Sequence, residues 1–399
     1  MFVDRIYMDN AATTRVTEPV FEAMQPYFGE IYGNPMSVHS FGREARKGVE
    51  EARRQVAAAL NAEPSEIYFT GCGTESDNWA IRGAAYANLR KGKHLITTQI
   101  EHHAVLHTCE QLEREGFNVT YLPVDEFGIV RMDALKDAIR PDTTLISVMA
   151  ANNEIGTIQP IEEIAKLAKE RGILFHTDAV QAIGSLSFDV KAMGIDLLSL
   201  SGHKFHAPKG VGALYIRNGV RLQRLIQGGA QERTQRAGTE NVASIVGLGK
   251  AIAMAAENID RHNAQLTAVR DRLIDRILAE IPYTRLNGHR TQRLPGNCNI
   301  SFRFIEGESL LLALDLKGIA GSSGSACTSG SLDPSHVLLA IGLPHEIAHG
   351  SLRLSLSEEN TIEQADRVVD ALKEIVARLR SMSPLYDDFL REGENEGQN

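Results

Sequence analysis

A lysine stands at the end of a short apolar segment in "SLSGHKFHAPKG" (199–210), where His203 and Lys204 occupy the place at which a strand should end. Ligands of open α/β sheets bind at the carboxyl ends of the strands, so Lys204 is expected to face a site. A lysine in such a place can form a Schiff base with a carbonyl cofactor. For a lone lysine the simpler interpretation is an exposed loop residue, a role that suits Lys209 nearby.

An aspartate ends another apolar segment, "FHTDAVQ" (175–181), at Asp178. Pyridoxal phosphate enzymes place a carboxylate against the pyridinium nitrogen, because the protonated ring then withdraws electrons. An aspartate at a strand end can instead cap a following helix. From this segment alone, both interpretations stay open.

A third polar position follows a strand in "FTGCGTESDN" (69–78), where a turn of small residues leads through Gly73 and Thr74 into a predicted helix. Free backbone N–H groups at a helix N-terminus, with a hydroxyl beside them, form a cradle for phosphate. Many connections between strands and helices look alike, so this signal is weak by itself. Together with Lys204 and Asp178 it indicates a cofactor site.

Short apolar runs alternate with amphipathic helical patterns over the first two thirds of the chain, which predicts an α/β fold with a mainly parallel sheet and helices on both sides. The predicted strands are 66–71, 94–99, 118–124, 143–150, 173–179, 196–202 and 212–217. A long helical stretch follows at 241–281, then a strand at 297–302 and a helix at 308–316. Thr361 and Gln364 are spaced as a capping box for a last helix, which indicates a smaller α+β domain at this end.

The composition, the net charge and the cysteine content of the chain exclude several classes of protein. Of 399 residues, 43% are hydrophobic, and no apolar run approaches the roughly 18 residues of a membrane span. The net charge of -9 is spread without long runs, which argues against nucleic acid as a direct partner. No export signal precedes "MFVDRIYMDNAATTR", so the expected location is the cytoplasm. The four cysteines form no C-x-x-C pair and no cluster at zinc-ligand spacing, so no metal site is expected.

Ten short stretches, in order along the chain, carry a resemblance to one known family. They are "YMDNAATT", "GNPMSVHSFGR", "TESDN", "EHHAV", "NNEIG", "HTDAVQ", "SGHKFHAPKG", "QERTQRAGTEN", "SSGSACTSGS" and "GSLRLSL". With them the chain resembles the pyridoxal phosphate-dependent cysteine desulfurases of the nitrogen-fixation and iron–sulfur-cluster assembly type, which have the type I aminotransferase fold of class V. The resemblance implies a large cofactor-binding domain at 15–260, a small domain at 1–14 and 261–390, and a polar, disordered tail at 391–399.

The resemblance also assigns roles around the cofactor, pyridoxal 5'-phosphate. It implies that Lys204 binds the cofactor covalently and later takes the Cα proton of the substrate. Asp178 would pair with the ring nitrogen, His102 of "EHHAV" would stack on the ring and relay protons, and Gln181 would hydrogen-bond the ring hydroxyl.

The resemblance also implies partners for two anionic groups, the carboxylate of the substrate and the phosphate of the cofactor. Asn153 and Arg353 would bind the substrate carboxylate, to which a guanidinium group can donate two parallel hydrogen bonds. The phosphate would be held by Gly73, Thr74, Ser201, His203 and, from a second subunit, Thr239.

Cys327 lies among small residues in "SSGSACTSGS" (322–331). The resemblance implies that it attacks the sulfur of the substrate, becomes a persulfide and releases alanine. Glycine and serine in the segment at about 321–333 lower the cost of moving the thiol inward and outward again. Cys109 and Cys298 are expected to be small buried residues, and Cys72 a small residue near the phosphate.

The sequence therefore indicates a homodimeric L-cysteine desulfurase that supplies sulfur to an iron–sulfur scaffold or another acceptor protein. Close alternatives are a selenocysteine lyase and a sulfur donor mainly for tRNA thiolation. An aminotransferase reaction would leave the Cys327 segment unexplained. A docking subunit without catalysis would leave Lys204, Asp178 and Arg353 unexplained.

Overall fold

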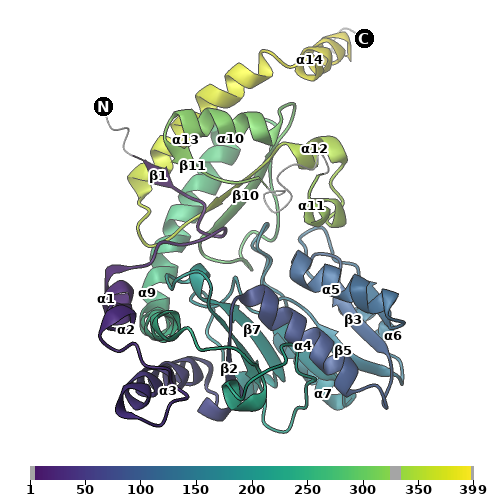
Figure 1. Ribbon diagram of the computed structural model, residues 1–399. Helices are drawn as coiled ribbons and strands as arrows, with labels where there is room; N and C mark the ends of the chain where they lie inside the picture. The colour runs from purple at the N-terminus through teal and green to yellow at the C-terminus, as the bar shows by residue number, and fades with distance from the viewer. Residues whose placement is uncertain (1–4, 324–333, 397–399) are drawn as a thin grey trace.

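Seven strands form the larger sheet in the computed structural model, which describes residues 5–323 and 334–396 (Figure 1). Each matches one of the seven strands predicted in this part of the chain. In order across the sheet they are β2 (Ile67–Thr70), β8 (Gly212–Ile216), β7 (Leu197–Ser201), β6 (Leu174–Asp178), β5 (Thr143–Ser147), β3 (His94–Thr98) and β4 (Asn118–Leu122).

The directions of the strands confirm a mainly parallel sheet and add one exception. The pairings from β7 through β6, β5 and β3 to β4 are parallel, whereas β8 runs antiparallel to both β7 and β2. Only residues 202–211 connect β7 to β8. That is less than the dozen or more residues of a parallel crossover, so the chain turns back on itself.

Helices cover both faces of this sheet, as the alternation of strands and helices predicted. Successive side chains of a strand point to opposite faces. On β7, Leu198 and Leu200 belong to the core that includes residues of α3 and α9, whereas Leu197 packs with residues of α4 and α5. The helical elements of this lobe are α1 (Glu18–Met24), α2 (Pro26–Gly29), α3 (Ser40–Leu60), η1 (Pro64–Glu66), α4 (Gly73–Ala87), α5 (His103–Arg114), α6 (Met132–Ala138), α7 (Ile161–Glu170), α8 (Val190–Met193), η2 (Gly202–Lys204) and η3 (Glu232–Thr234).

A second lobe has its own apolar core. Its antiparallel sheet has the order β12–β10–β9, and β1 near the N-terminus pairs with β11 far along the chain. The elements are β1 (Ile6–Tyr7), β9 (Thr284–Leu286), β10 (Asn297–Phe302), α10 (Gly307–Leu316), β11 (Ile319–Ala320), α11 (His336–Ala340), α12 (His345–His349), β12 (Ser351–Ser355), α13 (Ile362–Arg380) and α14 (Pro384–Glu396).

The long helix α9 (Val242–Glu280) connects the two lobes (Figure 1). Its first part contributes Ile245 and Leu248 to the core of the large lobe, and its last part contributes Leu273 and Ile277 to the core of the small lobe. Among the described residues it is also the one helix long and apolar enough to cross a membrane, but burial in two cores accounts for that composition. We propose that the lobes divide within α9, near the expected boundary at residue 260.

The start of α13 matches the prediction from the sequence, whereas α14 extends into the segment that was expected to be a disordered tail. Thr361 Oγ1 accepts from the backbone N–H of Gln364, and the Gln364 side chain accepts in return, which confirms the capping box. The expected polar tail at 391–399 begins inside α14, which continues to Glu396.

A buried ion pair ties α3 to η3. The Arg53 guanidinium donates to both carboxylate oxygens of Glu232 at 2.8 and 2.9 Å, and one Glu232 oxygen also accepts from the Phe69 backbone N–H. Both side chains are almost fully buried. Each charge therefore depends on the other for compensation.

We expect Arg53→Met to lower the free energy of unfolding by about 3–5 kcal/mol, because it leaves the Glu232 carboxylate buried without its cation. The double variant Arg53→Met/Glu232→Gln should recover most of this loss, because no buried charge remains. Urea unfolding of the three proteins measures both effects. A single variant as stable as the wild type would show that the pair is not a structural tie.

Candidate active site

A cavity of about 290 Å³ lies where the parallel strands of the large sheet end. It brings together residues that are far apart in sequence, because the carboxyl ends of β3, β5, β6 and β7 share one edge of the sheet. Of the residues predicted from the sequence, it is lined by Gly73, Thr74, His102, Asn153, Asp178, Gln181, Ser201, His203, Lys204 and Arg353.

Lys204 ends η2, directly after β7, and its amine lies in the wall of the cavity. Its Nζ donates to the backbone carbonyls of Ala11 and Ala12 at 2.6 and 2.9 Å. Gln181 Nε2 donates to the same carbonyl of Ala11 at 2.9 Å. The segment "DNAATT" near the N-terminus therefore holds the lysine. The spacing of residues in the sequence could not predict this contact.

Asp178 is the last residue of β6 and is only 5% exposed. Its Oδ1 accepts from the Val180 backbone N–H at 2.9 Å, so it does cap a turn, but the residues that follow form turns and not a helix. Burial raises the pKa of Asp178 to about 6, while this hydrogen bond and the charge of Lys204 act in the opposite direction. A cation in the cavity would favour the ionised form further.

His102 is the N-cap residue of α5 and faces the cavity. Its Nδ1 accepts from the Ala104 backbone N–H at 3.1 Å, so the neutral ring carries its proton on Nε2. Burial, followed by the charge of Lys204, lowers the pKa of His102 to about 4. The ring is therefore neutral at physiological pH.

One corner of the cavity has the features of a phosphate site. The first residues of α4, Gly73 and Thr74, present backbone N–H groups there, and Ser201 and His203 lie opposite. A Cβ atom on Gly73 would lie 2.7 Å from Val180 Cγ2, so only glycine lets the helix start this close to the strand ends. Helix N-termini of this kind bind anions.

Arg353 on β12 enters the cavity from the small lobe and is 4% exposed, which excludes a solvent-facing arginine. Its Nη2 donates to Asp9 at 3.1 Å and its Nη1 donates to the Asn153 backbone carbonyl at 3.2 Å. Nε is buried without a hydrogen-bond partner in the described part of the chain. An unsatisfied guanidinium N–H at the wall of a cavity suits a planar anion.

Two predicted site residues remain to be accounted for. Thr239 is exposed and does not line the cavity, which leaves its expected role across a subunit boundary a prediction. Cys327 lies outside the described residues. The other three cysteines match expectation: Cys109 and Cys298 are buried, and Cys72 lines the cavity at the N-cap of α4.

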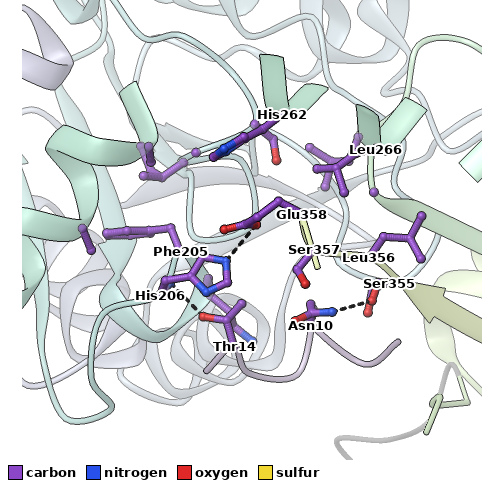
Figure 2. Close-up of a pocket in the computed structure, with 18 of the residues that line it drawn as sticks. Asn10, Thr14, Phe205, His206, His262, Leu266, Ser355, Leu356, Ser357 and Glu358 are labelled. Atoms are coloured by element: carbon purple, nitrogen blue, oxygen red, sulfur yellow. Dashed lines mark hydrogen bonds and ion pairs between the residues drawn. The ribbon is translucent and has the colours of Figure 1, made fainter. Parts of the chain in front are cut away.

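A second cavity of about 320 Å³ is lined by residues of both lobes (Figure 2). It shares Ala11, Gln181 and Lys204 with the first. Across it, His206 Nε2 meets Glu358 Oε2 at 3.2 Å, while His206 Nδ1 donates to the Arg15 carbonyl at 2.9 Å. Because both ring nitrogens face acceptors, the imidazolium form is required for both contacts.

Comparisons with known proteins now identify the family. The class-V aminotransferase profile matches residues 6–368. The chain belongs to the class-V aminotransferase family. Cysteine desulfurase IscS of Methanosarcina thermophila is 62% identical over 380 residues, which are 95% of this chain and 94% of that protein.

Solved structures agree with this assignment. A NifS-like protein superimposes on this class-V aminotransferase with a TM-score of 0.89 and 41% identity, covering 94% of this chain and 99% of the other. SspA in complex with cysteine gives a TM-score of 0.78 and 40% identity, covering 88% and 99%. The predicted fold class is thereby confirmed.

The His206–Glu358 pair should make stability depend on pH in a defined direction. Contacts with Glu358 raise the pKa of His206 against the effect of its burial, so this contribution is complete below about pH 6.5 and is lost as the pH rises through the higher folded value. The pKa of Glu358 falls to about 2, because the contact with His206 outweighs burial, so its contribution is complete above about pH 4.3.

We therefore expect Glu358→Gln to lower the free energy of unfolding by about 1 kcal/mol near pH 5.5, and by clearly less near pH 9. Urea unfolding of the variant and the wild type at the two pH values measures the difference. Glu126→Gln, at an exposed carboxylate that does not line this cavity, is the matched control. A loss for Glu358→Gln that is equal at both pH values would contradict a charged His206.

Proposed function

We propose that this class-V aminotransferase is a pyridoxal phosphate-dependent L-cysteine desulfurase. The observation that carries the proposal is the convergence of Lys204, Asp178, His102 and Arg353 on one cavity beside the N-terminus of α4. Relatives named cysteine desulfurase that are 54–62% identical over at least 95% of the chain support the same reaction.

The residues of the cavity fit pyridoxal 5'-phosphate. A part-buried lysine amine, a buried carboxylate and a helix N-terminus lie around one space, as an aldehyde, a ring nitrogen and a phosphate require. Lys204 would hold the aldehyde carbon, Asp178 the ring nitrogen and Gln181 the ring hydroxyl. The phosphate would be held by Gly73, Thr74, Ser201 and His203. When bound, the cofactor supplies an electron sink that weakens the bonds at Cα and Cβ of an amino acid.

Arg353 provides the best match for the carboxylate of the substrate. Its buried Nε lacks a partner among the described residues, and Asp9 and the Asn153 carbonyl hold the guanidinium in place. Asn153 lies beside it in the cavity wall and would complete the carboxylate site. The structural relative described as a complex with cysteine supports L-cysteine as the amino acid bound.

Proton transfers fall to two side chains at the cavity. The Lys204 amine lies in the cavity wall and would take the Cα proton of the bound amino acid. His102 is neutral and carries its proton on Nε2, so it can donate and accept protons near the ring. Lys204 has to be in its neutral form to take the Cα proton, whereas His102 is already neutral.

Cys327 is the proposed sulfur acceptor. Its thiolate attacks the sulfur of the substrate, a new S–S bond forms as the C–S bond breaks, and Cβ receives a proton to give L-alanine. The products are alanine and a Cys327 persulfide. The persulfide then passes its outer sulfur to an iron–sulfur scaffold or another acceptor protein.

The cellular setting completes the proposal. We place the enzyme in the cytoplasm as a homodimer, in which Thr239 of one subunit reaches the phosphate of the other. The exposed position of Thr239, outside the cavity of its own subunit, is consistent with that arrangement.

The test is to incubate the purified holoenzyme with L-cysteine and a reductant, and to measure alanine and sulfide. We expect Cys327→Ser to lower both by roughly 100-fold or more while the cofactor absorbance persists. Cys72→Ser should stay within a few-fold of the wild type and is the matched control. Full activity in Cys327→Ser would exclude this thiol as the acceptor, and a wild type that forms no alanine would exclude the reaction.

A further inference from the structure

Asp77 is a buried acid in the cofactor cavity to which the proposed function gives no role. It lies in the second turn of α4, is 1% exposed and lines the cavity. Its Oδ1 is buried without a hydrogen-bond partner in the part of the chain that the structure describes. A fully buried acid with an unsatisfied oxygen is costly, and most costly when it is ionised.

The geometry of the sheet sets the neighbours of Asp77. Residues 176 and 178 of β6 point to the same face because side chains alternate along a strand. The register pairs Asp178 with Ser199 on β7, and α4 packs over this face. Asp77 on α4 therefore meets His176, Asp178 and Ser199 together.

Hydrogen bonds hold the ring of His176 between two serine hydroxyl groups. His176 is fully buried, with Nδ1 2.8 Å from Ser147 Oγ and Nε2 3.0 Å from Ser199 Oγ. Asp77 lies close to Ser199, and Asp77 Oδ1 lies 3.7 Å from His176 Nε2. Since two hydroxyl groups satisfy both nitrogens of the neutral ring, His176 has no need to become a cation for Asp77. Burial lowers the pKa of His176 to about 3.

Three buried carboxyl groups act on one another in this region. Glu101 accepts from Thr98 Oγ1 at 2.7 Å and from the Met149 backbone N–H at 3.1 Å, and it lies at 0% exposure. Burial raises the pKa of Glu101 to about 8, and burial followed by the charge of Asp178 raises the pKa of Asp77 well above its usual value. The cation whose charge favours ionisation here is Lys204, and it acts on Asp178.

We propose that Asp77 is a positioning residue that carries a proton in the working enzyme, so that the single negative charge of the Asp77–Asp178 pair stays on Asp178. This inference rests on the proposed function, because the charge on Asp178 is useful only if a pyridine nitrogen lies against it. A protonated Asp77 leaves an uncharged oxygen at the unsatisfied position and adds no second negative charge. It thereby keeps Asp178 in a polar surrounding without competing for the ring nitrogen.

The proton itself can be observed in the apoprotein. The infrared difference spectrum between the wild type and Asp77→Asn near pH 7 should contain the carbonyl stretch of a protonated carboxyl group, lost in the variant. Loss of carboxylate bands in its place would overturn the proposal. This readout does not depend on the cofactor, so it is separate from a failure of the proposed function.

The positioning role is tested through cofactor binding. The probes are pyridoxal 5'-phosphate and its analogue with CH in place of the ring nitrogen, and the measured quantity is the ratio of their dissociation constants. This ratio measures how strongly the protein prefers the cofactor with a ring nitrogen. In Asp77→Asn, which introduces a neutral and nearly isosteric side chain, we expect the ratio to stay within about twofold of the wild-type value. Asp77→Leu should reduce it about tenfold, because an apolar neighbour makes Asp178 harder to ionise.

Asp196→Asn is the matched control, because Asp196 is a buried acid of the same sheet that bonds the Phe175 backbone N–H and Arg217 away from the cavity. It should leave the preference unchanged. The proposal is overturned if Asp77→Asn reduces the preference as much as Asp77→Leu does, or if neither variant changes it. A wild type that shows no preference for the ring nitrogen would count against the proposed function itself.

Discussion

The candidate active site of this protein depends on one constraint: several parallel strands have their carboxyl ends at the same edge of the sheet. Strands β3, β5, β6 and β7 lie side by side and run in the same direction, so the residues that follow them meet without long connecting loops. Lys204 and Asp178 owe their proximity to that arrangement. The cost is the burial of a carboxylate and the partial burial of an amine, which is tolerable because the two groups lie near each other and near backbone partners.

Burial also sorts the protonation states in the cavity. It lowers the pKa of His102 and His203 to about 4. It also raises the pKa of Glu101, which precedes His102 but does not line the cavity, to about 8, so all three groups are neutral at physiological pH. The charged groups that remain have defined partners: Asp178 has the Val180 N–H, and Arg353 has Asp9. A neutral surrounding with a few fixed charges is well suited to a cofactor that has to withdraw electrons in one direction.

Much of this arrangement could be predicted from the sequence, because the signals are local. Apolar runs ending in a polar residue located β6 and β7 to within a residue or two, and the Thr361–Gln364 spacing located the start of α13. The antiparallel direction of β8 was missed, although the short connection at 202–211 carried the information. Buried strands look the same in either direction, so only the length of the connection distinguishes them.

Other parts of the site follow from contacts that leave no trace in spacing. The carbonyls of Ala11 and Ala12 that hold Lys204 come from the other end of the chain, and Asp77 lies in a quoted motif to which no role was assigned. Whether an acid in a helix is exposed or faces a strand end depends on how the helix packs on the sheet. Thr239 differs again, because its expected role requires a second subunit.

The central claim is that Lys204 is the amine that holds the cofactor aldehyde in this cavity. It is tested most directly by reducing the holoenzyme with borohydride and mapping the peptide that carries the pyridoxyl group. We predict a single modified peptide from the segment 201–210, with the group on Lys204. A pyridoxyl group on any other lysine, or on none, would contradict the account.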